Sequence, residues 1–149
     1  MSDGIRIYRI DVVIKRYQSS SYVGRIWDVD VNDKIEEEEE EGYIAKASFR
    51  DVVNTNINPV LFCCELTIKV NLDDVDVDEE EVKERVKNFV DEFVKKYMEY
   101  SLSIRDLYND LLDLFTDLKI PYSTIGHEVH MYDSGGDYPE ASLNLIYYG

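Results

Sequence analysis

Carboxylates at regular spacing are the groups in this sequence best able to bind a partner or an ion. In the segment LDDVDVD at 72–78, Asp74, Asp76 and Asp78 alternate with valines. Side chains two residues apart on a strand point to the same face, so extended backbone here would align three carboxylates about 6.6 Å apart. Such a row of fixed negative charges suits a cation or a positively charged protein surface.

Two further segments repeat this arrangement. Asp28 and Asp30 alternate with valines in a segment that we predict to be a strand. A predicted helical segment carries four more aspartates within a sector of about 60°, separated by roughly 4.5–6 Å of axial rise. These four are Asp106, Asp110, Asp113 and Asp117. Phosphates along one DNA strand lie at a similar spacing, roughly 6–7 Å apart through space.

The choice of aspartate on the helix favours a binding role. Aspartate is a poor helix former, and glutamate or lysine would make a better solvated face. Only Arg105 and Lys119 lie near the four aspartates, so most of the row has no oppositely charged partner four residues away. Short, unpaired carboxylates are what a mimic of nucleic-acid phosphates requires. The alternative is an acidic surface that only keeps the protein in solution.

The net charge of the 149-residue chain is −16 at pH 7, and it is unevenly distributed. Residues 1–25 contain five basic and two acidic residues, whereas residues 26–149 contain 11 basic and 30 acidic ones. A field of that sign repels phosphate and attracts basic surfaces. We therefore expect no direct binding to nucleic acid, and we expect a basic nucleic-acid-binding protein or complex as the partner.

A calcium loop is the first alternative use of these carboxylates. An EF-hand loop that starts at Asp74 requires glycine at position 79 and glutamate at position 85. The sequence has Glu79 and Arg85 there, so the EF-hand pattern fails. A weak surface cation site is all that remains of this alternative, and we predict no metal site.

A small enzyme built around the histidines is the second alternative. The only histidines are His127 and His130, in the segment HEVH, which is one residue short of the H-E-x-x-H zinc motif. In a strand, Glu128, His130 and Tyr132 share one face and could form an acid–base site. No nucleophile elbow or glycine-rich phosphate loop is present, so we predict no cofactor and do not expect an enzyme.

Composition predicts a folded protein inside a cell. Hydrophobic residues make up 44% of the chain and there are twelve tyrosines, whereas disordered acidic chains are poor in aromatic residues. No apolar run of about 18 residues and no signal-peptide pattern is found, so we expect no membrane association and a cytoplasmic location, including the cytoplasm of an infected host. Adjacent Cys63 and Cys64 point to opposite faces of a strand, which predicts two free thiols.

The pattern of apolar residues predicts a single α+β domain over residues 1–149. Strands are expected at 5–17, 22–31, 43–53 and 60–70, and a final hairpin is expected at 122–132 and 139–148. The six consecutive glutamates before Gly42 predict a mobile acidic loop at 36–42. With a helix over about 79–118, the result is an antiparallel sheet of about six strands, in the order β-β-β-β-α-(α)-β-β, with one long or kinked helix packed on one face. The second α in brackets stands for a break of this helix into two.

The length of that helix raises the third alternative. No Gly or Pro interrupts residues 79–118, and the apolar residues of its two halves keep one helical phase. Such a helix is roughly 60 Å long, about twice the diameter of a domain of this size. The overhanging apolar stripe would need cover, either from a second protomer or from a break in the helix. The first possibility gives an alternative function, a structural or assembly protein that homodimerises through the helix and whose acidity serves solubility only.

An acidic, protein-binding inhibitor is the function that the carboxylate rows predict. It would occupy a Lys- and Arg-lined groove of a nucleic-acid-handling complex in place of phosphate, with steep salt dependence. The chain has only three alanines and one glutamine, a usage typical of AT-rich genomes. Small acidic proteins of such genomes are common in viruses and mobile elements, which fits an anti-defence protein such as an anti-CRISPR inhibitor.

Overall fold

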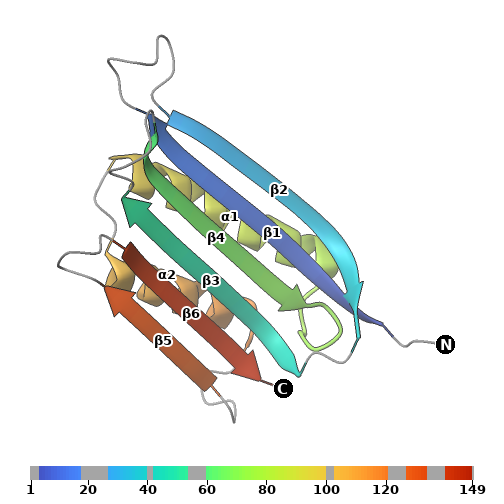
Figure 1. The fold of residues 1–149 in the computed structure, drawn as a ribbon. Coiled ribbons are helices and arrows are strands. Elements are labelled where there is room, and N and C mark those ends of the chain that lie inside the picture. The colour runs from blue at the N-terminus through green and yellow to red at the C-terminus, as the bar shows by residue number, and fades with distance from the viewer. Residues whose placement is uncertain are drawn as a thin grey trace.

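A six-stranded antiparallel sheet forms the framework of the protein (Figure 1). The computed structural model describes residues 4–17, 27–39, 42–53, 60–99, 103–120, 127–133 and 140–148, with side chains except at 52–53, 60–62, 127–133 and 140. The strands are β1 (Ile5–Tyr17), β2 (Trp27–Glu38), β3 (Tyr43–Val53), β4 (Val60–Asn71), β5 (His127–Asp133) and β6 (Glu140–Tyr148). They lie side by side in the order β2-β1-β4-β3-β6-β5, so β2 and β5 form the two edges.

Alternation along the strands gives the sheet one apolar and one polar face. In β1, Ile10, Val12 and Ile14 are buried, whereas Asp11, between the first two, and Lys15, after the third, are only partly buried. The register carries the same alternation across the sheet, because residues directly opposite one another share a face. Ile10 is opposite Ile68 and Val12 is opposite Leu66, and both partners are also buried. The apolar face is therefore continuous and must be covered.

Two helices cover the apolar face, as Figure 1 shows behind the sheet. They are α1 (Glu79–Glu99) and α2 (Ile104–Asp117). The α+β class predicted from the sequence is thus confirmed, but the single helix over 79–118 is wrong. Lys96 of α1 forms an ion pair with Asp110 of α2, with 2.9 Å between the nitrogen and the oxygen, which shows that the second helix turns back beside the first.

The turn between the helices has a physical cause. The hydroxyl oxygen of Ser103 accepts a hydrogen bond from the backbone N–H of Asp106 at 3.1 Å, which caps the first turn of α2. By turning back, the chain buries both apolar stripes on one sheet, whereas a straight helix of roughly 60 Å would leave half of its stripe in water. The stripe residues in the centre of each helix, such as Val86 and Leu111, are fully buried. The argument for dimerisation through the helix therefore no longer holds.

Polar contacts fix α1 against the sheet. Tyr97 donates a hydrogen bond to Asp51 of β3 at 2.7 Å, and burial raises the pKa of that carboxyl. Near the middle of α1, Lys87 forms an ion pair with Asp33 of β2 at 3.3 Å. Asp33 also accepts a hydrogen bond from the hydroxyl of Tyr8 at 2.9 Å, which is the largest cause of its lowered pKa. Neither helix in the described part of the chain is long and apolar enough to cross a membrane.

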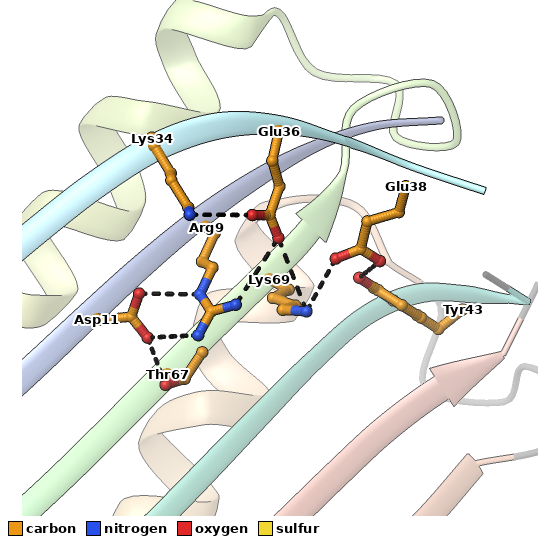
Figure 2. A network of polar contacts seen from close by, with 8 residues as sticks. All are labelled: Arg9, Asp11, Lys34, Glu36, Glu38, Tyr43, Thr67 and Lys69. Atoms are coloured by element: carbon orange, nitrogen blue, oxygen red, sulfur yellow. Dashed lines mark hydrogen bonds and ion pairs between the residues drawn. The ribbon is translucent and has the colours of Figure 1, made fainter. Parts of the chain in front are cut away.

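The glutamate run predicted as a mobile loop at 36–42 is in part strand. β2 continues to Glu38, and Figure 2 shows why these like charges are tolerated. Lys69 of β4 lies 2.8 Å from Glu38 and 3.8 Å from Glu36, and Arg9 of β1 lies 3.8 Å from Glu36. Cations from β1 and β4 thus neutralise Glu36 and Glu38. The sequence of the glutamate run does not indicate that Arg9 and Lys69 lie beside it in the sheet.

Ser103 provides a test of the two-helix arrangement. Substitution of Ser103 by alanine is expected to lower the free energy of unfolding by about 1 kcal/mol, because the N-cap acceptor is lost. In a continuous helix the same change would raise stability, because alanine is the better helix former. Thr116→Ala, at an exposed position inside α2, is the control and is expected to leave stability unchanged or raised. Chemical denaturation of the three proteins distinguishes the two arrangements.

Lys69 provides a test of the open-face network. Burial alone would raise the pKa of Glu38, but hydrogen bonds from Lys69 and Tyr43 help to hold that pKa below its usual value. Lys69→Met is therefore expected to cost about 1–3 kcal/mol at pH 7. A glutamate whose pKa is lower in the folded than in the unfolded protein stabilises the fold at pH values above its unfolded-state pKa. This stabilisation is lost as the pH falls through the folded-state pKa. The difference in unfolding free energy between Lys69→Met and the parent protein should therefore shrink below about pH 4.

Lys34 provides the control for that experiment. Its side chain is 61% exposed and its ion pair with Glu36 is 3.3 Å long, so Lys34→Met should cost less than about 1 kcal/mol. Equal losses for the two variants, or a Lys69→Met deficit that does not change with pH, would contradict the structural role of the network.

Candidate protein-binding surface

The four aspartates predicted on a helix lie along α2, beside a groove between the two helices. Asp110, Asp113 and Asp117 line the groove, and Asp106 lies one turn before them, exposed in the first turn of α2. The spacing of three and four residues that defined the row in the sequence places them on the side of α2 that faces α1. Of the three predicted carboxylate rows, this is the one whose residues line this groove.

The groove has a volume of about 340 Å³ and two kinds of lining. Its apolar lining comes from Phe89 and Phe93 of α1 and Leu114 of α2. Phe93 and Leu114 are buried members of the core, so this part of the groove is fixed by packing. Charged side chains of both helices also line the groove, so its apolar strip lies between charged residues of α1 and charged residues of α2. A groove of this kind suits side chains that combine an apolar stem with a cationic head.

The cations in the groove are already paired with acids. Lys96 donates a hydrogen bond to Asp110, and this bond raises the pKa of the ammonium group. Arg85 binds Glu81, one turn earlier on α1, at 2.7 Å. The expectation that the aspartate row is unpaired is therefore wrong for Asp110. The partner was missed because it comes from the other helix, and a pairing rule for residues four apart within one helix does not include it.

Three carboxylates of the groove keep their charge free for a partner. Glu92, Asp113 and Asp117 have no hydrogen bond or ion pair within the described part of the chain, although Asp117 lies close enough to Arg85 to influence its pKa. Asp113 and Asp117 are exposed on α2, and Glu92 is exposed on α1. Negative charge thus remains on both walls of the groove. A cation entering between the helices would meet carboxylates from each side.

The row predicted at 74–78 does not form. Asp74 lies in a turn and Asp76 in a bend where the chain passes from the sheet to α1, so Asp74, Asp76 and Asp78 do not share one strand. The amide of buried Asn71 donates a hydrogen bond to Asp74 at 3.0 Å. The carbonyl of Asp78 accepts the first backbone hydrogen bond of α1, which places this residue at the helix N-terminus. Aspartate is favoured in both roles by local hydrogen bonding and by the helix dipole.

Asp28 and Asp30 lie on a different side of the molecule. They belong to β2, as predicted, opposite Lys15 and Val13 of β1. These positions alternate with buried Ile14, so the two aspartates are on the open face of the sheet, away from the helices. Asp28 and Asp30 therefore lie on the opposite face of the sheet from the row on α2, and a single basic groove could not contact all nine predicted residues. The row on α2 is the part that remains as a candidate site.

The histidine segment lies in a strand, as predicted. β5 spans His127–Asp133, with Glu128 opposite Ile146 and His130 opposite Asn144 of β6. The side chains of Glu128, His130 and Tyr132 lie outside the described residues, so the acid–base hypothesis stays a prediction. Among the described residues, no group of three or more His, Cys, Asp or Glu side chains gathers in a way that could hold a metal ion.

The two cysteines are free thiols, which confirms the prediction. Cys64 is buried on the helix-covered face and Cys63 is partly buried. Burial raises the pKa of both thiols, so they are protonated and poorly nucleophilic at neutral pH. Neither cysteine therefore supplies the reactive thiolate that nucleophilic catalysis or metal binding requires.

Comparison with known proteins adds no assignment to this geometry. A scan against protein-family models, a search of curated proteins and a search of solved structures found no match.

Proposed function

We propose that this protein binds a basic, nucleic-acid-handling protein through the groove between α1 and α2 and so blocks the access of nucleic acid to that partner. The observation that carries the proposal is the row of aspartates on one wall of the groove. Asp113 and Asp117 are exposed there, next to Asp110, and Glu92 faces them from α1. Axial rises of roughly 4.5–6 Å between successive aspartates match the spacing of phosphates that a Lys- or Arg-rich surface binds.

The mechanism is competition for the same cationic side chains. Lysines and arginines that bind consecutive phosphates would bind the carboxylates of α2, and their apolar stems would lie against Phe89 and Leu114. Asp110 would join the contact by exchanging Lys96 for a cation of the partner, since the ion pair with Lys96 is partly exposed to water. The net charge of −16 would accelerate the encounter and make it strongly dependent on salt. A viral or mobile-element inhibitor of a host defence complex would act in this way.

Reversal of charge on the α2 wall is the decisive test. The variant Asp113→Lys/Asp117→Lys is expected to weaken partner binding at least about tenfold, because two attractive contacts become repulsive. Binding is measured by pull-down from the native host at rising salt, followed by titration of the purified partner. The partner is expected to bind nucleic acid, and excess duplex DNA is expected to release it from this protein.

The control keeps the charge change and moves it elsewhere. Asp76→Lys/Asp91→Lys alters the net charge by the same amount at two exposed positions outside the groove. This control is expected to reduce the association rate modestly and to keep most of the affinity. If both variants bind equally well, or equally badly, the acid acts through bulk charge alone and the α2 groove is not the binding site.

A further inference from the structure

The edge strand β2 exposes apolar side chains that the fold leaves uncovered. Val29 is 37% exposed and Val31 is 43% exposed, and they are the exposed large hydrophobic residues among the described side chains. Both lie on the helix-covered side of the sheet, opposite buried Ile14 and Val12. α1 contacts β2 at Trp27, whose ring meets Tyr97 edge to face, and at Asp33, which binds Lys87. The two valines lie between these contacts and stay exposed.

The backbone of β2 is open as well. β2 is the first strand in the order of the sheet, so β1 is its one neighbour among the strands that the structure describes. A strand of 12 residues with one side unpaired presents a row of free N–H and C=O groups to another strand. An exposed edge of this length next to exposed valines is a surface on which a further strand can add.

We infer that a second copy of this chain pairs with β2, antiparallel, about a two-fold axis at Val31. Each residue then faces the residue of the second copy that is equally far from Val31. The two exposed valines at position 31 meet at the axis, and Trp27 faces Ile35 of the second copy. On the open face, Asp28 faces Lys34 of the second copy and Asp30 faces Asn32. Because of the two-fold symmetry, each of these pairs occurs twice.

Charge selects this register over its neighbours. The two-fold axis keeps the faces of the sheets aligned, so the register can change only in steps of two residues. One step in one direction places Asp30 against Asp30 of the second copy. One step in the other direction places Asp28 against Glu36. The register centred on Val31 has no directly opposed like charges between residues 27 and 35, and it has two opposed pairs of opposite charge.

This dimer does not depend on the proposed function, and salt separates the two. Two protomers of charge −16 repel each other, so screening by salt is expected to strengthen the dimer. Binding of a basic partner is weakened by the same salt. The α2 groove also lies away from β2, so either surface can fail without affecting the other.

Disulfide formation tests the register directly. Val31→Cys is expected to give a disulfide-linked dimer under mild oxidation, because residues facing each other across antiparallel strands have Cα atoms about 4.5–5.5 Å apart. Val29→Cys is the matched control, with the same substitution at a similar exposure. In this register the two cysteines at position 29 are about 13 Å apart and should not link. Equal linking of the two variants, or none for Val31→Cys, would overturn the inference.

A charge swap tests the pairing of Asp28 with Lys34. Lys34→Asp is expected to weaken the dimer about tenfold, measured by analytical ultracentrifugation, because two attractive pairs become repulsive. Adding Asp28→Lys to this variant should restore the dimer. Lys95→Asp, at an exposed position on α1, changes the net charge equally and should leave the dimer intact. Failure of the double variant to recover, or equal loss with Lys95→Asp, would count against the pairing.

Discussion

Burial of one face of the sheet is the constraint on which the rest of this structure depends. Six antiparallel strands create a continuous apolar surface, and the residues that cover it come from a single stretch between the fourth and fifth strands. One straight helix would cover a strip about 10 Å wide and leave the remainder exposed. Two antiparallel helices cover a width of about two helix diameters, so α2 runs back beside α1. The groove with its aspartates exists because of this turn.

The sequence predicted the elements better than their arrangement. β1 and β3 agree with the expected ranges because alternation and β-branched residues are local signals. The break before α2 was missed because Ile104 and Leu107 continue the helical phase of Val90 and Phe93. Phase records which side of a helix is apolar, and both helices present that side to the same sheet. The cap at Ser103 is the local sign of the break, and no glycine or proline accompanies it within residues 79–118.

Errors about the charged residues have a common origin. Glu36 and Glu38 were assigned to a loop, and Asp110 was expected to be unpaired, because only neighbours in the sequence were considered. In the structure their cations come from other elements, Lys69 of β4 and Lys96 of α1. The position of Asp28 and Asp30 in a strand was predicted correctly. The strand order and register place them on the open face of the sheet, away from the row on α2, and the local sequence does not contain this information. Local pattern identifies candidate carboxylates, and only the fold shows which of them act together.

The strand order also determines when the hydrophobic core can be completed during synthesis. β6 pairs with β3, from which it is separated by more than eighty residues of sequence, and it supplies Tyr147, whose ring meets Phe115 of α2 edge to face at 5.3 Å between centroids. Until residues 140–148 have left the ribosome, β3 is an open edge and α2 has no surface on which to bury this aromatic ring. The first four strands and α1 can assemble earlier. Completion of the core therefore depends on its last strand, and a chain that stalls before it would display an adhesive edge to the cell.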